Sequence, residues 1–489
     1  MLRPMRLRGL AVGLVATLVL AAGACGGSDE VTGGAEGGGE SAEFVPANAP
    51  AYVYVNTDFE SDAWKNLEAL LDKFPDREQA LSQIREGLSG EGITFEELKA
   101  ALGPETAVGV LSFAGEGMAF GLNEAKDQAK LDALIQKLDQ SAGGEPTLKE
   151  VVDGWTIVSD EQAAIDAAKR GHEGESLADS DLFDEAMGDL SGDAVVRFYV
   201  DGAALSRQLD AQSQGAATSL AGGGTLTSLA GQVTAADDGF GFDLVARTEG
   251  AEEPKTYASK LVSLVPADAL LYVSLGGFGD QLKQASSNPQ LQQQLGAIQG
   301  LLGISVTELA DIFKDEVALY VRQGSPFPEV TLAVTVENEQ QSMATIDRLA
   351  LRLGQFAGGG APTPTKIGDV DAKRLTIQNF AVYYAAFDGK LVLTSATTGI
   401  SELSGGGAKL GDDDTFKAAK EAADMPDETA GFVYVNIEDS LPLLENFAQT
   451  AGEPLPSEAR SNAEPLRSAL FYATGEKGKA RVKGFLRIE

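Results

Sequence analysis

The pattern of hydrophobic and polar residues alternates along the chain between strand-like and helix-like segments. The same series of segments occurs twice, once in each half. Short apolar runs predict strands, and a 3.6-residue period predicts an amphipathic helix. In the first half, the predicted strands are 51–56, 107–111 and 118–122, followed by a helix at 126–138. In the second half they are 270–275, 317–321 and 330–336, followed by a helix at 340–353. Strands joined by hairpins and interrupted by helices indicate an α+β fold with mainly antiparallel sheets and packed helices.

Short sequence matches between the two halves suggest a tandem duplication. The segment Pro46–Val53 resembles Pro266–Val273, which aligns Tyr52 with Tyr272. Further matches pair Glu105 with Glu316, the turn Asp153-Gly154 with Asp388-Gly389, and Tyr199 with Tyr434. Thr94-x-x-Glu97 and Ser305-x-x-Glu308 are both predicted capping boxes that open a helix. We therefore expect two α+β repeats, residues 44–250 and 251–489, and leave open whether they share one sheet.

Several of these segments resemble sequences of an uncharacterised bacterial family called domain of unknown function 3352. The resemblance rests on Pro-Ala-x-Ala-x-x-Tyr-Val at Pro46, Leu-Gly-x-Glu at Leu102, and the run from Ser176 to Phe183 before Tyr199-Val200-Asp201. It covers most of residues 44–489. The second half departs from the pattern at Phe313-Lys314-Asp315. The resemblance implies an envelope-associated protein and assigns no activity.

The N-terminus has the pattern of a secretion signal. Arg3, Arg6 and Arg8 precede an apolar run that ends in small residues before Cys25. Small residues directly before a lone cysteine resemble the lipobox of bacterial lipoproteins, although Ala22 stands where leucine is commonest. That resemblance implies removal of the signal peptide 1–24 and attachment of lipid, with fatty acids such as palmitate, to Cys25. An ordinary cleaved signal and a retained membrane anchor are the alternatives.

Residues 25–43 combine the cysteine with a glycine-rich acidic segment. This segment has few apolar side chains to bury, so we expect a flexible tether. The tether would hold a folded body at the extracytoplasmic side of a cell membrane. A disordered end without a spacing role is the alternative.

Composition narrows the classes of function. The chain has 489 residues, which by length alone corresponds to about three domains. Its formal net charge of −35 disfavours nucleic-acid binding, because phosphate backbones would be repelled. One cysteine and one histidine exclude an internal disulfide and a zinc site with several Cys or His ligands.

Few residues suggest catalysis or cofactor binding, and we expect no catalytic residue, cofactor or metal site. His172 lies between glycines and is expected to be an exposed loop residue. The acidic clusters Asp179-Ser180-Asp181 and Asp412-Asp413-Asp414 each precede a helix, which favours N-capping over weak Ca²⁺ binding. Trp64 and Trp155 are expected in the core, with carbohydrate stacking by Trp155 as an alternative.

Apolar helix faces are expected to be core, or alternatively to line a lipid groove. The faces concerned are formed by Leu67, Leu70 and Leu71, and by Leu295, Ile298 and Leu302.

Three functions remain open after the sequence is read. The first is a membrane-tethered envelope lipoprotein with a non-enzymatic binding or structural role, whose partner is an unknown envelope protein or hydrophobic ligand. The second is a carrier of a lipid or another hydrophobic ligand, which an apolar cavity of several hundred Å³ would favour. The third is a carboxylate-based hydrolase, which needs two acids lining one cleft.

Overall fold

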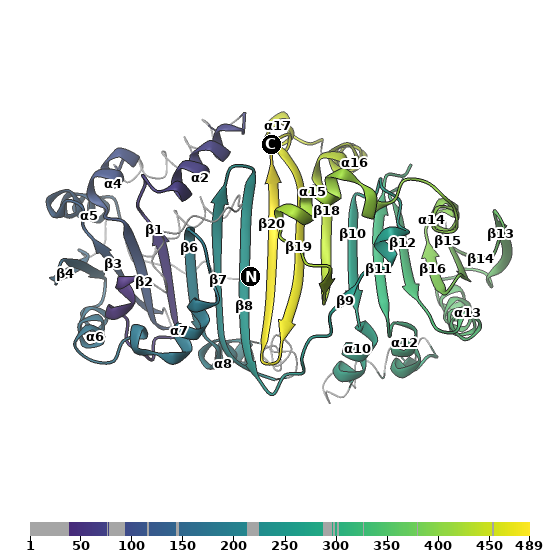
Figure 1. The fold of residues 1–489 in the computed structure, drawn as a ribbon, viewed down its shortest axis with the longest axis horizontal. Coiled ribbons are helices and arrows are strands. Elements are labelled where there is room, and N and C mark those ends of the chain that lie inside the picture. The colour runs from purple at the N-terminus through teal and green to yellow at the C-terminus, as the bar shows by residue number, and fades with distance from the viewer. Residues whose placement is uncertain are drawn as a thin grey trace. The chain divides into compact units, whose positions relative to one another are not determined.

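The computed structural model describes residues 39–489 apart from 76, 78–92, 115–116, 143–145, 213–223, 287–295, 297–298, 301–302, 326, 379 and 452–453. The chain forms two compact units (Figure 1). Unit 1 holds the described residues up to Glu253 together with Ser457–Leu466 and Glu476–Glu489. Unit 2 holds Pro254–Pro456 and Arg467–Gly475.

Unit 1 contains an antiparallel sheet in the order β4-β5-β3-β2-β1-β6-β7-β8-β20. Its strands are β1 (Ala51–Asn56), β2 (Glu105–Ser112), β3 (Met118–Glu124), β4 (Leu148–Val152), β5 (Trp155–Ser159), β6 (Ala194–Asp201), β7 (Thr225–Ala236), β8 (Gly239–Glu249) and β20 (Lys479–Ile488). Its helices are η1 (Glu40–Phe44), α2 (Asp62–Asp72), α4 (Phe95–Ala101), α5 (Gln128–Ala142), α6 (Gln162–Glu173), η2 (Leu177–Asp179), α7 (Asp181–Gly188), α8 (Gly202–Gln212) and α17 (Ser457–Ala463).

Unit 2 contains an antiparallel sheet in the order β13-β14-β15-β16-β12-β11-β10-β18-β19. Its strands are β10 (Leu271–Gly276), β11 (Glu316–Arg322), β12 (Glu329–Thr335), β13 (Thr363–Ile367), β14 (Val370–Ile377), β15 (Phe380–Phe387), β16 (Lys390–Thr394), β18 (Gly431–Asn436) and β19 (Leu466–Glu476), besides the short pair β9 (Tyr257–Ala258) and β17 (Glu428–Thr429). Its helices are η3 (Leu261–Ser263), α10 (Phe278–Ser286), α12 (Val306–Ile312), α13 (Glu339–Phe356), α14 (Thr397–Ser404), η4 (Leu410–Asp412), α15 (Asp414–Ala422) and α16 (Ile437–Ala451).

The two units repeat one order of elements, which confirms the α+β class and the predicted tandem duplication. In register, Tyr52 lies opposite Tyr199 in unit 1, and Tyr272 lies opposite Tyr434 in unit 2. Both predicted capping boxes form, at α4 and at α12. The matched turns also agree, because Asp153 and Asp388 both have a φ of 47°. The hairpin β13–β14 is an insertion in unit 2, in the region where the second repeat is longer.

Each sheet has two faces. We call the face that carries the paired tyrosines the first face, and the opposite face the second face. The first face carries Tyr52 in unit 1 and Tyr272 in unit 2, and both side chains are fully buried. Phe183 of α7 packs edge-on against Tyr199, with ring centroids 5.2 Å apart. Phe416 of α15 packs the same way against Tyr434, at 5.0 Å. A phenylalanine from the helix after the acidic cluster therefore closes the first face of both units.

Two predicted boundaries differ from the structure. Residues 40–43, predicted to be flexible tether, belong to the helix η1, in which Ser41 and Ala42 are buried. The folded body therefore includes residues 40–43 and does not begin at residue 44. The last strand of the second predicted repeat, β20, belongs to unit 1, because it pairs with β8 along its whole length. The boundary 250/251 therefore separates the two repeats in the sequence, but it does not separate the two compact units, because the C-terminal strand β20 belongs to unit 1.

The buried phenylalanines should dominate the stability of their units. We expect Phe183→Ala to lower the free energy of unfolding by about 3–5 kcal/mol, because it leaves a cavity against the tyrosines. The neighbouring Leu182 is 44% exposed, so Leu182→Ala should change it by about 0.5 kcal/mol or less. Urea unfolding of both variants measures the difference, and similar losses would show that Phe183 is not a core residue.

Candidate functional site

The predicted lipid-attachment residue, Cys25, lies outside the described residues, as do the signal peptide and most of the tether. Among the residues that the structure describes, no helix is long and apolar enough to span a membrane.

The acidic clusters cap helices. Asp413 accepts a hydrogen bond from the backbone N–H of Phe416 at 2.9 Å, and Ser180 caps α7 through the N–H of Phe183. Asp179 accepts from both the N–H and the hydroxyl of Ser176. Within the described ranges, no group of three or more His, Cys, Asp or Glu side chains could hold a metal ion.

His172 is not the exposed loop residue that its flanking glycines suggested. It lies in the last turn of α6, and its ring stacks on Phe44 with centroids 4.1 Å apart. Its Nε2 lies 2.9 Å from a carboxylate oxygen of Asp153. Gly171 lies within α6. A larger residue would not fit there, because a Cβ would lie 2.8 Å from the main-chain oxygen of Phe44. The glycine permits close packing against η1 rather than a loop.

Both tryptophans and the first predicted leucine face are core residues. Trp155 is 5% exposed and packs on Phe44, so its ring offers no surface for a sugar. Trp64 donates its indole N–H to the main-chain oxygen of Asn56 at 2.8 Å. Leu67 and Leu70 are buried beside Trp64, with Leu71 partly buried. The second leucine face, Leu295, Ile298 and Leu302, lies outside the described residues.

A glutamate occupies the same place in each unit: Glu105 of unit 1 is half-buried and Glu316 of unit 2 is buried. In unit 1, Glu105 accepts hydrogen bonds from the backbone N–H groups of Glu40 and Ser41, at 3.2 and 3.0 Å, and from the Ser41 hydroxyl. Burial raises the pKa of the Glu105 carboxyl, although these hydrogen bonds act in the opposite direction.

The glutamate of unit 2, Glu316, holds its own segment in the same way. It accepts from the N–H groups of Lys260 and Leu261, at 2.8 and 3.1 Å. Each glutamate thus fixes the segment before the first strand to the second strand. Sequence matching aligned the two residues but gave no role for them.

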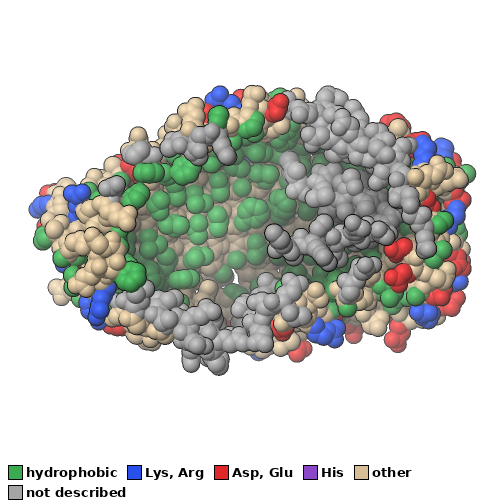
Figure 2. Space-filling model, turned by 180° about the vertical axis from the view of Figure 1, so that it is seen from behind, with side chains coloured by type: hydrophobic (Ala, Val, Ile, Leu, Met, Phe, Trp, Pro, Cys, Tyr) green, Lys and Arg blue, Asp and Glu red, His purple; other side chains and the backbone are tan. Residues whose placement is uncertain are grey.

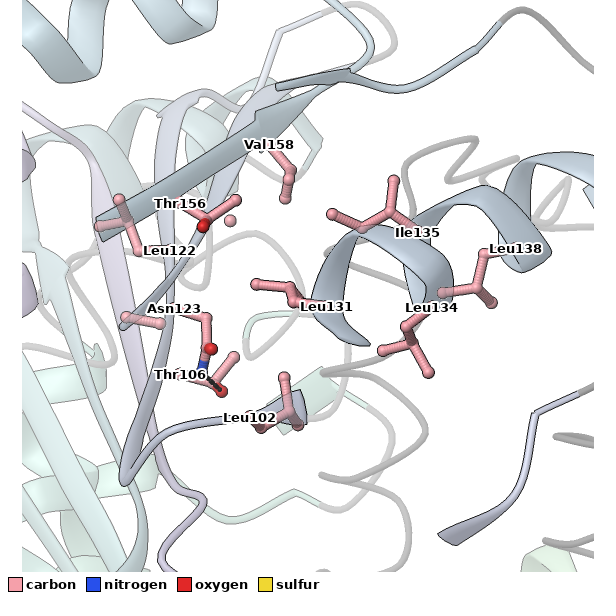
Figure 3. A pocket seen from close by; sticks show the side chains of 12 residues that line it. Leu102, Thr106, Leu122, Asn123, Leu131, Leu134, Ile135, Leu138, Thr156 and Val158 are labelled. Atoms are coloured by element: carbon pink, nitrogen blue, oxygen red, sulfur yellow. Dashed lines mark hydrogen bonds between the residues drawn. The ribbon is translucent and has the colours of Figure 1, made fainter. Parts of the chain in front are cut away.

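Cavities within unit 1 do not match a lipid site. The apolar cavity between α5 and the sheet measures about 50 Å³ and is lined by side chains such as Leu131, Leu134 and Val158 (Figure 3). Drug-sized ligands occupy cavities of about 300–1,000 Å³, so this one is too small. A depression of about 440 Å³ is large enough, but Asp58, Glu60, Lys99, Glu124 and Lys126 line it. Phe59 and Leu102 also line it, but an acyl chain there would lie among five charged side chains.

The second face of unit 2 carries hydrophobic side chains that remain partly exposed. We call the following residues the apolar face: Val273, Leu275, Leu319, Val330, Val433 and Phe471. Leu275, Val330 and Phe471 are 38%, 41% and 37% exposed, and the other three are half-buried. Phe471, Val433, Val273 and Leu319 lie opposite one another in register on four neighbouring strands. Figure 2 looks onto this side of the molecule and shows a broad area of hydrophobic side chains.

The corresponding face of unit 1 is covered by a helix. There α2 lies over β6 and β7, and Trp64, Leu67 and Leu70 pack with Val55, Val108 and Val196. In unit 2 the helix after the first strand is α10, which packs against α12 instead.

A glycine lets α10 take this position. A Cβ at Gly279 would lie 2.0 Å from the main-chain oxygen of Ala310 in α12, so only glycine permits the approach. At the edge of the same face, Ile346 and Ala350 of α13 cover Val334 and Leu391. Among the residues that the structure describes, no helix therefore lies over the centre of the second face in unit 2.

The sequence contained a signal for this open face. Segments such as Leu271–Gly276 and Glu316–Arg322 are apolar at both odd and even positions, which is typical of strands buried on two faces. Alternation alone did not show which of the two faces would lack a covering helix.

A family model matches residues 135–487 and is described as "Protein of unknown function (DUF3352)". The match covers more than half of the chain, and the chain therefore belongs to this family. No curated protein matches the sequence significantly.

Among solved structures, crystal forms III and I of a protein called TP0453 resemble parts of the chain. Form III is 9% identical, covers 44% of this chain and 82% of its own, and has a TM-score of 0.23. Form I is 13% identical, covers 46% and 76%, and has the same TM-score. Likenesses this weak carry no inference about fold or function.

The half-buried Glu105 of unit 1 should give a distinctive pH dependence. Because the pKa of Glu105 is raised above its ordinary value of 4.5, the folded state binds more protons than the unfolded state just above that pH. The stability contributed by Glu105 therefore falls as pH rises through its folded pKa. We expect the free energy of unfolding of the native chain, relative to that of Glu105→Gln, to fall as the pH rises above about 4.5.

Glu97 provides the control of opposite sign. A hydrogen bond from Lys137, followed by others from Thr94, lowers the pKa of Glu97. Its contribution is present above the unfolded pKa and is lost as pH falls, so the difference for Glu97→Gln should grow with pH. Urea unfolding at several pH values measures both trends. A difference for Glu105→Gln that widens with pH would contradict the assignment.

Proposed function

We propose that this protein is a lipid-anchored, extracytoplasmic protein of the cell envelope that binds the acyl chain of a lipid on the apolar face of unit 2. The observation that carries the proposal is the open second face in unit 2. Of the functions left open by the sequence, a non-enzymatic binding protein for a hydrophobic ligand fits this surface best.

The chemistry of the apolar face favours a hydrocarbon chain. Its side chains are Val, Leu and Phe, so it offers no side-chain hydrogen bond and no charge. Strands lie about 4.8 Å apart, so the row from Phe471 to Leu319 is about 14 Å long and continues to Leu332 on β12. Each CH₂ group that leaves water contributes about 0.8 kcal/mol, so a long chain lying along this row would bind without polar contacts.

The expected lipid anchor would bring the apolar face close to its ligand. Acylation of Cys25 and a tether over 26–38 would keep the body within about 20 Å of a membrane. The proposal contains no catalytic step, since His172 packs on Phe44 and the acidic clusters cap helices.

The first test places a charge on the apolar face. Leu275→Glu should weaken binding of 16-carbon lysophosphatidylcholine by about tenfold or more, because the carboxylate would have to be desolvated under the chain. Titration calorimetry of the purified full-length chain, with the ligand below its micelle concentration, measures the affinity. The matched control is Val151→Glu, at a strand position of unit 1 that is 50% exposed. Failure of the native chain to bind, or equal losses in both variants, would overturn the proposal.

The second test concerns the anchor. Cys25→Ala should abolish incorporation of labelled palmitate and move the protein out of the membrane fraction, or leave it as an unprocessed precursor. Metabolic labelling and fractionation of cells expressing either chain measure this directly. Absence of label from the native chain would remove lipid anchoring from the proposal and leave the apolar face to be judged by binding alone.

A further inference from the structure

The helix α16 is strongly amphipathic, yet its apolar side is exposed. At 100° per residue, Ile437, Leu441, Leu443, Leu444, Phe447 and Ala448 fall on one side of the helix. Leu444 is 52% exposed and Phe447 is 57% exposed. None of the described side chains of α16 is buried. A surface helix normally packs such a stripe against the core, so the exposed stripe indicates a missing partner.

The duplicate helix of unit 1 shows how α16 could have packed. Asp201 caps α8 by accepting from the N–H of Ala204, and its counterpart Asn436 caps α16 by accepting from the N–H of Asp439. The first residue of α8 is Gly202, where a Cβ would lie 2.3 Å from the main-chain oxygen of Leu226. This close approach lets α8 lie on β7. Ile437 occupies the same position in α16 and excludes that packing.

The start of α16 lies at one end of the apolar face. The helix follows β18 directly, and the last residues of β18 pair with the first residues of β10. The side-chain nitrogen of Gln323, just beyond β11, lies 3.5 Å from the main-chain oxygen of Asp439. Val330 begins the neighbouring strand at this same end, opposite Val321. The helix that carries the exposed stripe therefore begins at one end of the apolar face.

We propose that α16 forms the second wall of the lipid site, so that the acyl chain lies between Leu444 and Phe447 of α16 and the apolar face. This inference rests on the proposed function and adds the element that shields the outer side of the chain. A chain lying on an open sheet keeps one side in water, whereas a helix laid over it removes that side as well. Because Ile437 replaces the glycine that lets α8 pack on its sheet, the apolar side of α16 is exposed and can contact a ligand.

Charge selects the head group of the lipid. The polar side of α16 carries Glu438, Asp439 and Glu445 and no basic residue, although Arg467 lies 3.7 Å from Glu438. Helices that lie on anionic membranes carry Lys and Arg on their polar side, so α16 does not fit that role. The acidic helix instead favours a single lipid with a zwitterionic or uncharged head group.

A fluorescent reporter tests whether the apolar side of α16 contacts the ligand. The chain has two tryptophans, and both Trp64 and Trp155 are buried in unit 1. In Phe447→Trp, monomeric 16-carbon lysophosphatidylcholine should shift the added emission to shorter wavelength. In the control Gln449→Trp, on the polar side of the same helix, the emission should not move. A shift in both variants, or in neither, would overturn the inference.

Charge variants separate the inference from the proposed function. Phe447→Glu should weaken binding of the 16-carbon ligand by about tenfold, whereas Gln449→Glu should bind like the native chain. If Leu275→Glu weakens binding but Phe447→Glu does not, the apolar face stands and the role of α16 fails. If the native chain does not bind this lipid, both fail. A blue shift in Phe447→Trp that rises with protein concentration without lipid would identify a second copy of the chain as the partner and refute the inference.

Discussion

A sheet whose strands are apolar on both faces must cover both faces, and this constraint organises the molecule. The first face is closed in both units by a short helix that inserts a phenylalanine against the tyrosine of β6 in unit 1 or of β18 in unit 2. A glutamate of the second strand accepts hydrogen bonds from the backbone of the segment that leads into each first strand, and both copies share this contact. The second face is where the units differ, because α2 lies across it in unit 1, whereas no helix of the described part of unit 2 covers the centre of this face.

A few residues that differ between the two repeats explain why the second face is covered in unit 1 but not by the described helices of unit 2. Gly279 draws α10 onto α12 and away from the sheet, and Ile437 prevents α16 from packing as α8 does. Both changes act on the same unit and expose hydrophobic surface in it. Exposed apolar surface is unfavourable in water, so a chain that keeps it on two adjoining elements is expected to use it for binding.

Much of the fold could be predicted from the sequence because it depends on local patterns. Strands such as Ala51–Asn56, the two capping boxes and the turns at Asp153 and Asp388 follow from periodicity and side-chain chemistry within a few residues. The tyrosine pairs followed from the duplication. His172 was placed wrongly because a glycine that permits close packing in a helix looks, in sequence, like a glycine in a loop.

The candidate site could not be predicted in the same way. Whether an apolar strand face is covered depends on where a helix packs, and that depends on contacts between residues far apart, such as Gly279 with Ala310. The stripe on α16 is visible in its sequence, but its exposure is not. Residues 40–43 likewise have the composition of a tether, and they are held by distant groups, such as the carboxylate of Glu105 and the hydroxyl of Tyr52.

The account depends most on the claim that an acyl chain occupies the second face of unit 2. Photocrosslinking with a lysophosphatidylcholine that carries a photoreactive group near the end of its acyl chain tests this most directly. Peptides from β10, β11, β18 and α16 should carry the label, and excess unlabelled lipid should remove it. Label confined to unit 1, or label that competitor does not reduce, would contradict the account.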